Sequence, residues 1–258
     1  MAGDVGVNIP VKTAAELDGM RASGRAAARV LAAVLERVAP GVMTRELEEA
    51  AREALEREGA QSAFLGYRGY PARICVSIND EVVHGIPGAR RIEAGDLVSV
   101  DCGVILNGWY GDVARTVVVG AGEPAAWRLV TVAEAALAAA TAAAVDGRRL
   151  GDVCAAIQQT VEAAGFSVVR DFVGHGIGRA LHEDPQIPNF GRPGTGPVLR
   201  AGMTLAIEPM VNERGSPVRV DPDGWTVRTC DGGRSAHVEN TVAVGQTAPE
   251  VLTDLGDG

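Results

Sequence analysis

Acidic side chains stand within two strongly apolar segments of this sequence, where an unpaired charge is costly. Asp101 and Asp112 lie in β-rich runs that are separated only by Asn107-Gly108. Asn-Gly between two such runs is a strong signal for a hairpin with a two-residue type I′ turn. The sequence therefore predicts that both aspartates belong to one hairpin, formed by residues 97–119.

The register of this hairpin decides whether the two carboxylates can act together. Counting back from the turn pairs Gly103 with Asp112 and Asp101 with Ala114. Side chains alternate along a strand, so the two aspartates share one face, with Cβ atoms up to about 7–8 Å apart. A pair of divalent metal ions about 3.5–4 Å apart fits that gap and offsets the repulsion between the carboxylates. The alternative is that one aspartate is simply exposed on an edge strand.

Three further ionisable side chains have equally apolar surroundings in the second half of the chain. His175 lies in Val-Gly-His-Gly-Ile-Gly, Glu208 in Leu-Ala-Ile-Glu-Pro-Met, and Glu239 in Ala-His-Val-Glu-Asn-Thr-Val. Buried carboxylates are paired, protonated or bound to a metal, and Glu208 taken alone fits a salt-bridged core acid better. As a set, these oxygen and nitrogen donors without a thiolate are typical of a hard or borderline divalent metal. They predict a dinuclear hydrolytic site.

Two more histidines stand in loops, and other enzyme classes are excluded. His84 and His182 lie between glycines and prolines, where a histidine is often merely solvated, so position alone assigns neither a role. The sequence contains neither H-E-x-x-H nor G-x-S-x-G, and the glycines around His175 do not form G-x-G-x-x-G. Lys12 is the only lysine and follows no glycine-rich loop, which excludes a P-loop and a Schiff-base lysine.

Composition restricts the class of protein further. With 258 residues, of which 47% are hydrophobic and 22% charged, the chain has the composition of a globular protein with a sizeable core. A net charge of -9 and only 4% aromatic residues argue against nucleic-acid binding. Four widely spaced cysteines, no signal-peptide pattern and no apolar run longer than 135–145 predict a cytoplasmic protein with reduced thiols, neither secreted nor embedded in a membrane.

Two similar groups of elements must position these side chains. A capping box at Thr13 starts a helix that extends to about residue 38, and Thr44 is expected to cap a second helix through residue 58. After the hairpin, helices are predicted over 124–145 and 150–164, followed by strands and turns in which Asp231-Gly232-Gly233 signals a further hairpin. Because two helices followed by strands occur twice, the sequence predicts two similar halves within one domain.

The chain resembles the type I methionine aminopeptidases of the bacterial kind. The resemblance runs from about Val11 to Thr253 and is carried by LGYRGYPARICVSIND, VVHGIPG, VDCGV, GDVARTV, GFSVVRDFVGHGIGRALHEDPQ, MTLAIEPMV and DGWTVRT. It implies an α+β pita-bread fold, shared with creatinase-like enzymes, in which two pseudo-symmetric halves form a curved antiparallel sheet covered by helices. The expected organisation is a lead over 1–12, one catalytic domain over 13–253 and a tail over 254–258.

The resemblance also assigns the site. It implies two divalent metal ions, of manganese, iron, cobalt or zinc, held by Asp101, Asp112, His175, Glu208 and Glu239, with Asp112 and Glu239 bridging both. His84 would contact the scissile amide nitrogen and His182 the carbonyl oxygen, while Glu208 would also move the proton of the attacking water. The pocket for the methionine side chain would be lined by Phe64, Tyr67, Tyr70, Cys75, Leu181 and Trp225, although the tyrosines and Trp225 on their own fit ordinary core packing.

Several residues depart from the family pattern. His237, Val238 and Asn240 stand where the family usually has glutamine, an aromatic residue and histidine, close to the last expected ligand. Residues beside metal ligands tune metal affinity, so this difference bears on metal preference. Phe64 is larger than the residue usual at its position in the bacterial enzymes, and Leu181 replaces a frequent aromatic residue. These two changes bear on the shape of the pocket.

The implied reaction is hydrolytic removal of the initiator methionine when the second residue is small. The expected partners are the N-termini of nascent polypeptides, with or without attachment to the ribosome, and a monomer that binds neither nucleic acid nor membranes is expected. One alternative is an Xaa-Pro aminopeptidase-like hydrolase, which generally carries a separate N-terminal domain for which the lead before Lys12 leaves no room. The other is a non-catalytic pita-bread binding protein, a class that typically loses metal ligands.

Overall fold

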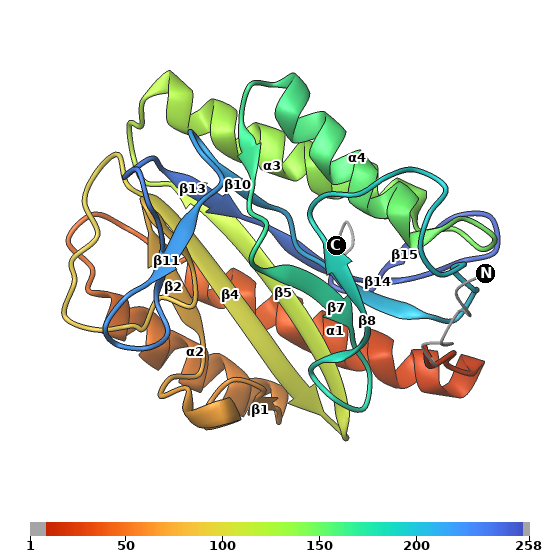
Figure 1. Cartoon of the computed structure of the whole chain (residues 1–258). Helices are drawn as coiled ribbons and strands as arrows, with labels where there is room; N and C mark the ends of the chain where they lie inside the picture. Colours follow the sequence, from red (N-terminus) through yellow and green to blue (C-terminus); the bar gives the residue numbers. More distant parts are fainter. Residues whose placement is uncertain (1–8, 255–258) are drawn as a thin grey trace.

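The computed structural model describes residues 9–254, which form helices packed on an antiparallel sheet (Figure 1). The helices pack in two pairs, the first two together and the last two together, behind the sheet in the view of Figure 1. In chain order they are α1 (Ala14–Leu35), α2 (Thr44–Glu58), α3 (Pro124–Ala143) and α4 (Leu150–Ala163).

The largest sheet has the strand order β1-β4-β5-β14-β9-β7-β8, with β2 also pairing β4 and β15 also pairing β14. Two smaller sheets have the orders β13-β10-β6 and β11-β12-β3. This architecture confirms the α+β class. The strands are β1 (Gln61–Ser62), β2 (Cys75–Ile78), β3 (Glu81–Val83), β4 (Leu97–Leu106), β5 (Trp109–Val118), β6 (Ser167–Val168), β7 (Val173–Gly176), β8 (Glu183–Pro188), β9 (Thr204–Ile207), β10 (Met210–Asn212), β11 (Val218–Val220), β12 (Val227–Thr229), β13 (Ser235–His237), β14 (Glu239–Ala243) and β15 (Glu250–Val251).

Each helix pair closes its own part of the core. Leu31 and Leu47, from α1 and α2, pack with apolar residues of β2, β4 and β5. Leu129 and Ile157, from α3 and α4, pack with β9 and β14. All four leucine and isoleucine side chains are almost completely buried, and each contributes about 1.5–3 kcal/mol to stability by the transfer of its apolar surface from water. The repeated order of elements therefore corresponds to two packed clusters joined where β5 pairs with β14.

The central hairpin has the predicted register. Leu106 faces Trp109, Gly103 faces Asp112, and Asp101 faces Ala114. Asn107 and Gly108 have φ angles of 52° and 76°, the left-handed backbone that a type I′ turn requires of both residues. The two aspartates therefore lie on one face, as the count from the turn predicts.

Three local predictions were inaccurate. The Thr13 capping box is present, but α1 ends at Leu35 rather than near residue 38. Thr44 does not cap α2, because Met43 occupies the cap position and the Thr44 hydroxyl instead exchanges hydrogen bonds with the backbone of Gly88. The turn at Asp231-Gly232-Gly233 joins β12 to β13, which belong to different sheets, so it does not close a hairpin.

Among residues 9–254, one helix is long and apolar enough to cross a membrane by length and composition alone. This helix is α3, which has a mean hydropathy of 1.2. It is longer than the apolar run 135–145 of the sequence. One side of α3 packs against α4 and the sheet, burying Leu129, Val130 and Leu137. Core helices of globular proteins meet the same criterion, and 39% of the apolar window of α3 is buried in the described structure.

The described part of the predicted lead packs on the domain. Ile9 is buried in the cluster formed with α3 and α4. The backbone N–H of Lys12 donates to the carbonyl of Gly202 at 2.8 Å, and its ammonium pairs with Glu183 at 2.6 Å. The rest of the predicted lead, and the predicted tail apart from residue 254, lie outside the described residues.

Candidate metal centre

The five expected metal ligands form a row across neighbouring strands. In sheet order, β4 carries Asp101, β5 carries Asp112, β14 carries Glu239, β9 is followed directly by Glu208, and β7 carries His175. Both β4 and β5 are interior strands, flanked on each side by a partner, so the alternative of an aspartate on an exposed edge strand is wrong. The sheet brings together residues that are more than 130 positions apart in the sequence.

The ligand atoms are close together and buried. The Nε2 atom of His175 lies 3.4 Å from a Glu208 oxygen and 4.0 Å from an Asp112 oxygen. Within residues 9–254, no lysine or arginine forms an ion pair with any of the four carboxylates, which contradicts a salt-bridged core role for Glu208. Asp101, Asp112 and Glu239 each retain one buried oxygen without a hydrogen-bond partner in the described chain. Buried oxygens of this kind need a cation, so these residues fit a divalent metal centre.

Burial sets the protonation of the metal-free site. It raises the pKa of Asp112 to about 7 and, together with the neighbouring carboxylates, raises the pKa values of Asp101, Glu208 and Glu239 well above their ordinary range. Burial also lowers the pKa values of the histidines, to about 3 for His175 and His237 and to about 4 for His84. The histidines are therefore neutral near pH 7, the form in which imidazole binds a metal.

These shifts predict how the stability of the metal-free protein depends on pH. A carboxyl group whose pKa is higher in the folded protein than in the unfolded chain stabilises the fold below its unfolded pKa, and this contribution is lost as the pH rises through the folded pKa. The midpoint of thermal unfolding, measured after chelation, should therefore increase as the pH falls from about 8.5 to about 6.5.

Below about pH 6.5 the histidines oppose this gain, because their lowered pKa values mean that the unfolded chain takes up protons more readily. Metal-loaded protein should show little of the increase, since the carboxylates then hold metal rather than protons. A midpoint of the chelated protein that instead decreased as the pH fell from about 8.5 to about 6.5 would contradict the raised pKa values of these carboxyl groups.

Two threonine hydroxyls hold the backbone of the site where the central strands separate. The ladder between β5 and β14 contains only the pairs Ala114–Glu239 and Val113–Asn240. At the next position, the Thr241 hydroxyl accepts from the Asp112 N–H and donates to the Asp112 carbonyl, at 2.9 and 2.8 Å. At the other end, the Thr116 hydroxyl does the same for His237, at 2.9 and 2.7 Å.

These two threonine clamps replace the ladder hydrogen bonds that separated strands cannot make. Each clamped backbone group is buried, so the loss of its partner would cost about 1–3 kcal/mol. The clamps therefore fix the backbone of Asp112, on β5, and that of His237, on β13, beside the metal centre.

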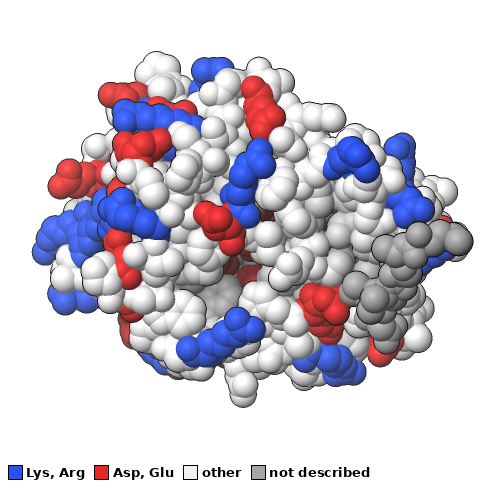
Figure 2. All heavy atoms as spheres, in the orientation of Figure 1, with Lys and Arg blue, Asp and Glu red and all other residues white. Residues whose placement is uncertain are grey.

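The expected substrate-binding residues line one cavity with the metal ligands. Its volume is about 270 Å³, and Figure 2 shows the opening as a hollow with acidic side chains inside and charged side chains of both signs at its margin. Aromatic rings form its walls, with Tyr70 and Trp225 in edge contact at 5.1 Å and His84 against Trp225 at 6.2 Å. The lining includes all eight expected residues: Phe64, Tyr67, Tyr70, Cys75, His84, Leu181, His182 and Trp225.

Two contacts orient groups at this cavity. The Tyr67 hydroxyl lies 2.9 Å from Nδ1 of His182, and the two rings stack at 5.4 Å. The ring of Phe64 lies against Gly103, opposite Asp112 in the hairpin, where a Cβ atom on Gly103 would be only 2.4 Å from the Phe64 ring. Gly103 therefore provides the space in which Phe64 reaches the cavity wall.

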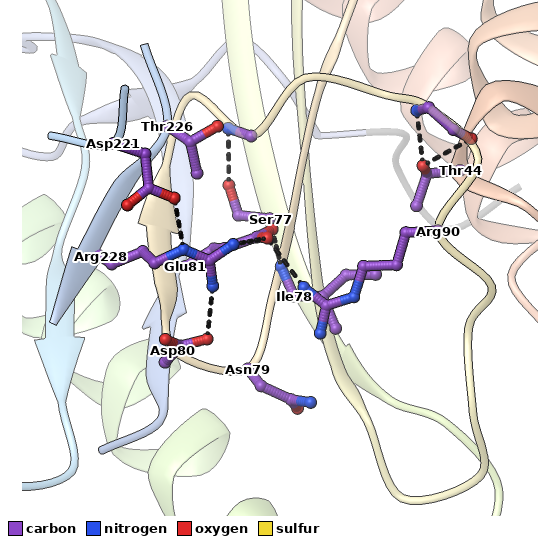
Figure 3. Close-up of polar contacts among 12 residues, drawn as sticks. Thr44, Ser77, Ile78, Asn79, Asp80, Glu81, Arg90, Asp221, Thr226 and Arg228 are labelled. Atoms are coloured by element: carbon purple, nitrogen blue, oxygen red, sulfur yellow. Dashed lines mark hydrogen bonds and ion pairs between the residues drawn. The ribbon is translucent and has the colours of Figure 1, made fainter. Parts of the chain in front are cut away.

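An ion-pair network holds the segment that carries His84. Figure 3 shows the guanidinium of Arg228, on β12, between Asp221 on one side and Asp80 and Glu81 on the other, at 2.6–2.7 Å. Glu81 begins β3, and His84 follows that strand with a φ of 62°. Such a left-handed backbone is strained for histidine and persists only where its surroundings impose it. On the other side of His84, Gly85 accepts from the Val76 N–H and donates to the Ser77 hydroxyl, so hydrogen bonds hold the chain both before and after His84.

Some residues of the site were not assigned from the sequence. Arg68, Asp171 and Phe172 also line the cavity, and each stands within a few residues of an expected site residue, although no spacing rule singles them out. His237 appeared only as a departure from the family pattern, yet its Nε2 atom lies 3.8 Å from Glu208 and 3.9 Å from Glu239. Its place beside two ligands depends on the pairing of β13 with β10, which is non-local.

Comparisons with known proteins agree with this geometry. The chain is 50% identical to the methionine aminopeptidase of Clostridium perfringens, covering 95% of this chain and 98% of that protein. It is 48% identical to methionine aminopeptidase 1 of Mycobacterium tuberculosis, covering 95% of each. The crystal structure of methionine aminopeptidase from Thermotoga maritima matches with a TM-score of 0.94 and 47% identity, covering 95% of this chain and 99% of that one.

A more distant match shows the fold alone. The prolidase from Pyrococcus furiosus has a TM-score of 0.76 at 23% identity, and the match covers 95% of this chain and 65% of the prolidase. The pita-bread fold implied by the sequence is thus confirmed. Residues 18–246 match the model of metallopeptidase family M24, and with the relatives above this shows that the chain belongs to that family.

Proposed function

We propose that this metal-dependent hydrolase removes the initiator methionine from polypeptides whose second residue is small. The observation that carries the proposal is the meeting of two features in one cavity: a row of buried carboxylates that requires cations, and an adjoining aromatic pocket with two histidines. The names of the close relatives support the same activity.

The metal would be held by Asp101, Asp112, His175, Glu208 and Glu239, which offer oxygen and nitrogen atoms to hard or borderline divalent ions. Two bound ions would polarise the scissile carbonyl and lower the pKa of a water so that it attacks at neutral pH. Glu208 is only partly buried and faces the cavity, so its carboxylate can take the proton of that water and pass it to the leaving nitrogen.

The two cavity histidines act on the scissile amide. Partial removal of the His182 ring from water at the cavity, together with the nearby Arg68, lowers the pKa of His182, which keeps its ring neutral. In the tautomer with its proton on Nε2, the ring accepts from the Tyr67 hydroxyl at Nδ1 and can donate from Nε2 to the carbonyl oxygen as negative charge develops there. His84, which lines the cavity against Trp225 and Phe172, contacts the amide nitrogen.

The aromatic pocket binds the methionine side chain. Tyr70, Trp225 and Phe64 present ring faces and edges, and sulfur in contact with aromatic rings gains about 0.3–1.5 kcal/mol. Cys75 is buried in the wall of the same cavity, where burial and the charge of Asp101 raise the pKa of its thiol, so it stays protonated. It therefore contributes an uncharged wall rather than a nucleophile.

The activity is tested with peptides that differ only in the second residue. With the scissile carbonyl at the metal ligands and His84 at the amide nitrogen, the second side chain would be pressed against the cavity entrance, so only small side chains should fit. Met-Ala-Ser is expected to be cleaved at least about tenfold faster than Met-Leu-Ser, in terms of kcat/KM, because a steric clash costs more than about 1.4 kcal/mol. Equal cleavage of the two peptides would refute the proposed specificity.

The size of Phe64 predicts a second measurable preference. The Phe64 ring fills part of the pocket wall beside Gly103, so Phe64→Cys should enlarge the space for the first residue. The kcat/KM for an ethionine peptide, divided by that for the methionine peptide, should rise by about threefold or more. This increase is smaller than the full effect of one methylene group on selectivity in an apolar pocket. Leu65→Ala is the matched control, because Leu65 is exposed and does not line the cavity. An unchanged ratio in Phe64→Cys would remove Phe64 from the list of specificity residues.

The same assays distinguish the two alternatives. An Xaa-Pro aminopeptidase-like hydrolase would cleave an Xaa-Pro peptide in preference to Met-Ala-Ser, and a non-catalytic binding protein would cleave neither and would retain near-zero metal after reconstitution. The filled set of metal ligands argues against the second of these.

Partners and compartment follow from the proposed reaction. The substrates are the N-termini of new polypeptides, whether on or released from the ribosome, and the protein acts as a monomer. The compartment that suits such substrates is the cytoplasm, and the four free cysteines support a reducing environment. The net charge of -9 supports a protein that does not bind nucleic acid directly.

A further inference from the structure

His237 lies inside the metal centre although the family pattern does not use a histidine there. It ends β13 and is separated by one residue from the ligand Glu239 at the start of β14. Only 2% of its surface is exposed, and within the described chain its Nε2 atom has no hydrogen-bond partner. A buried, unpartnered imidazole nitrogen requires an explanation.

The position of this nitrogen fits a ligand and does not fit a hydrogen bond. Nε2 is 3.8 Å from Oε2 of Glu208 and 3.9 Å from Oε2 of Glu239, both beyond hydrogen-bond range. Two donor atoms that each bind one ion at about 2.0–2.2 Å stand about 3–4 Å apart. The three atoms therefore have the spacing of ligands around a shared cation.

The backbone holds the ring in this place. The Thr116 hydroxyl binds both the N–H and the carbonyl of His237, and the Ser99 hydroxyl in turn contacts that of Thr116 at 2.8 Å. The following N–H, of Val238, donates to the carbonyl of Pro209, directly after Glu208. His237 is thus fixed relative to both neighbouring carboxylates.

Two ligand groups result, each with one imidazole. One consists of Asp112, His175 and Glu239, and the other of Glu208, His237 and Glu239. We infer that His237 is an additional metal ligand, on the side of the centre formed by Glu208 and Glu239. This inference rests on the metal centre of the proposed function. The centre of this protein then binds metal through two histidine nitrogens rather than one.

A second imidazole changes which ions bind best. Imidazole favours zinc, cobalt and iron, whereas sites made of carboxylates suit manganese better. The replacement His237→Gln keeps a polar side chain of similar reach but removes the imidazole. It should weaken zinc binding about 10–100-fold, with a smaller loss for manganese.

Nuclear magnetic resonance of the zinc-loaded full chain, with ¹⁵N-labelled histidine, tests the inference directly. The resonance of a ring nitrogen that binds zinc moves away from the positions of both protonated and free nitrogens, and the chain contains only four histidines. Two zinc-bound nitrogens are expected in the wild type and one in His237→Gln. The control His84→Gln should retain two, because His84 belongs to neither ligand group.

The outcomes separate this inference from the proposed function. One zinc-bound nitrogen in the wild type, with metal retained, would overturn the role of His237 and leave the metal centre intact. No zinc binding at all would overturn both. Because the wild-type count decides by itself, poor folding of one variant does not prevent a result, and His237→Asn provides a second assignment of the signal.

Discussion

Replacement of Asp112 by asparagine is expected to reduce hydrolysis of Met-Ala-Ser at least about a hundredfold. An amide of the same shape carries no charge, so it no longer offsets two divalent ions in a poorly solvated site, where such interactions are worth several kcal/mol. The Thr241 clamp binds only the backbone of Asp112, so the strand geometry should be preserved. The expected defect is therefore weaker metal binding and slower turnover, measured by calorimetry and by peptide assays.

Asp171→Asn is the matched control for this prediction. Asp171 lines the same cavity but is exposed and is in neither ligand group, so its replacement should change turnover by less than about threefold. If folded Asp112→Asn turned over at a rate near that of the wild type, the conclusion that both hairpin aspartates serve one metal centre would be wrong.

Replacement of His182 by alanine is expected to reduce kcat about a hundredfold while metal content stays the same. The loss of one donor to a developing oxyanion has this magnitude. His182 is exposed at the cavity, its Nδ1 is engaged by Tyr67, and its ring belongs to neither ligand group. The measurements are single-turnover kinetics and metal analysis of the same preparation.

A conservative replacement distinguishes donation from packing in this case. His182→Gln retains an N–H donor of similar reach and should recover part of the lost rate, whereas a residue that only stacked on Tyr67 would show no such recovery. Loss of metal from His182→Ala, with full activity after reconstitution, would instead assign His182 as a ligand.

The sequence predicted those parts of the site that depend on local geometry. The Asn-Gly turn determines the register of the hairpin, so the common face of Asp101 and Asp112 followed from counting alone. Glu208, flanked by Ile207 and Pro209, was likewise expected to be buried, and it is largely but not fully buried. Both inferences rest on residues that are close together in the sequence.

What the sequence could not predict depends on pairing between distant strands. In the sheet, β14 lies between β5 and β9, and this order places Glu239 between Asp112 and Glu208. No local pattern shows that order. The five donors were recognised as a set from their residue types and surroundings, but their arrangement and the position of His237 were not foreseen. The Asp231-Gly232-Gly233 turn was misjudged for the same reason, because a turn signal does not specify which sheet the next strand joins.

The ion pair between Lys12 and Glu183 gives this protein a chemical handle. Lys12 is the only lysine, it is 8% exposed, and Glu183 follows His182 directly in the sequence. An amine-reactive ester therefore has a single ε-amine to modify, and that amine is shielded while the pair is closed. The rate of acylation at Lys12, resolved from that of the α-amine by peptide mapping, would then report how often the ion pair beside His182 opens, without any introduced label.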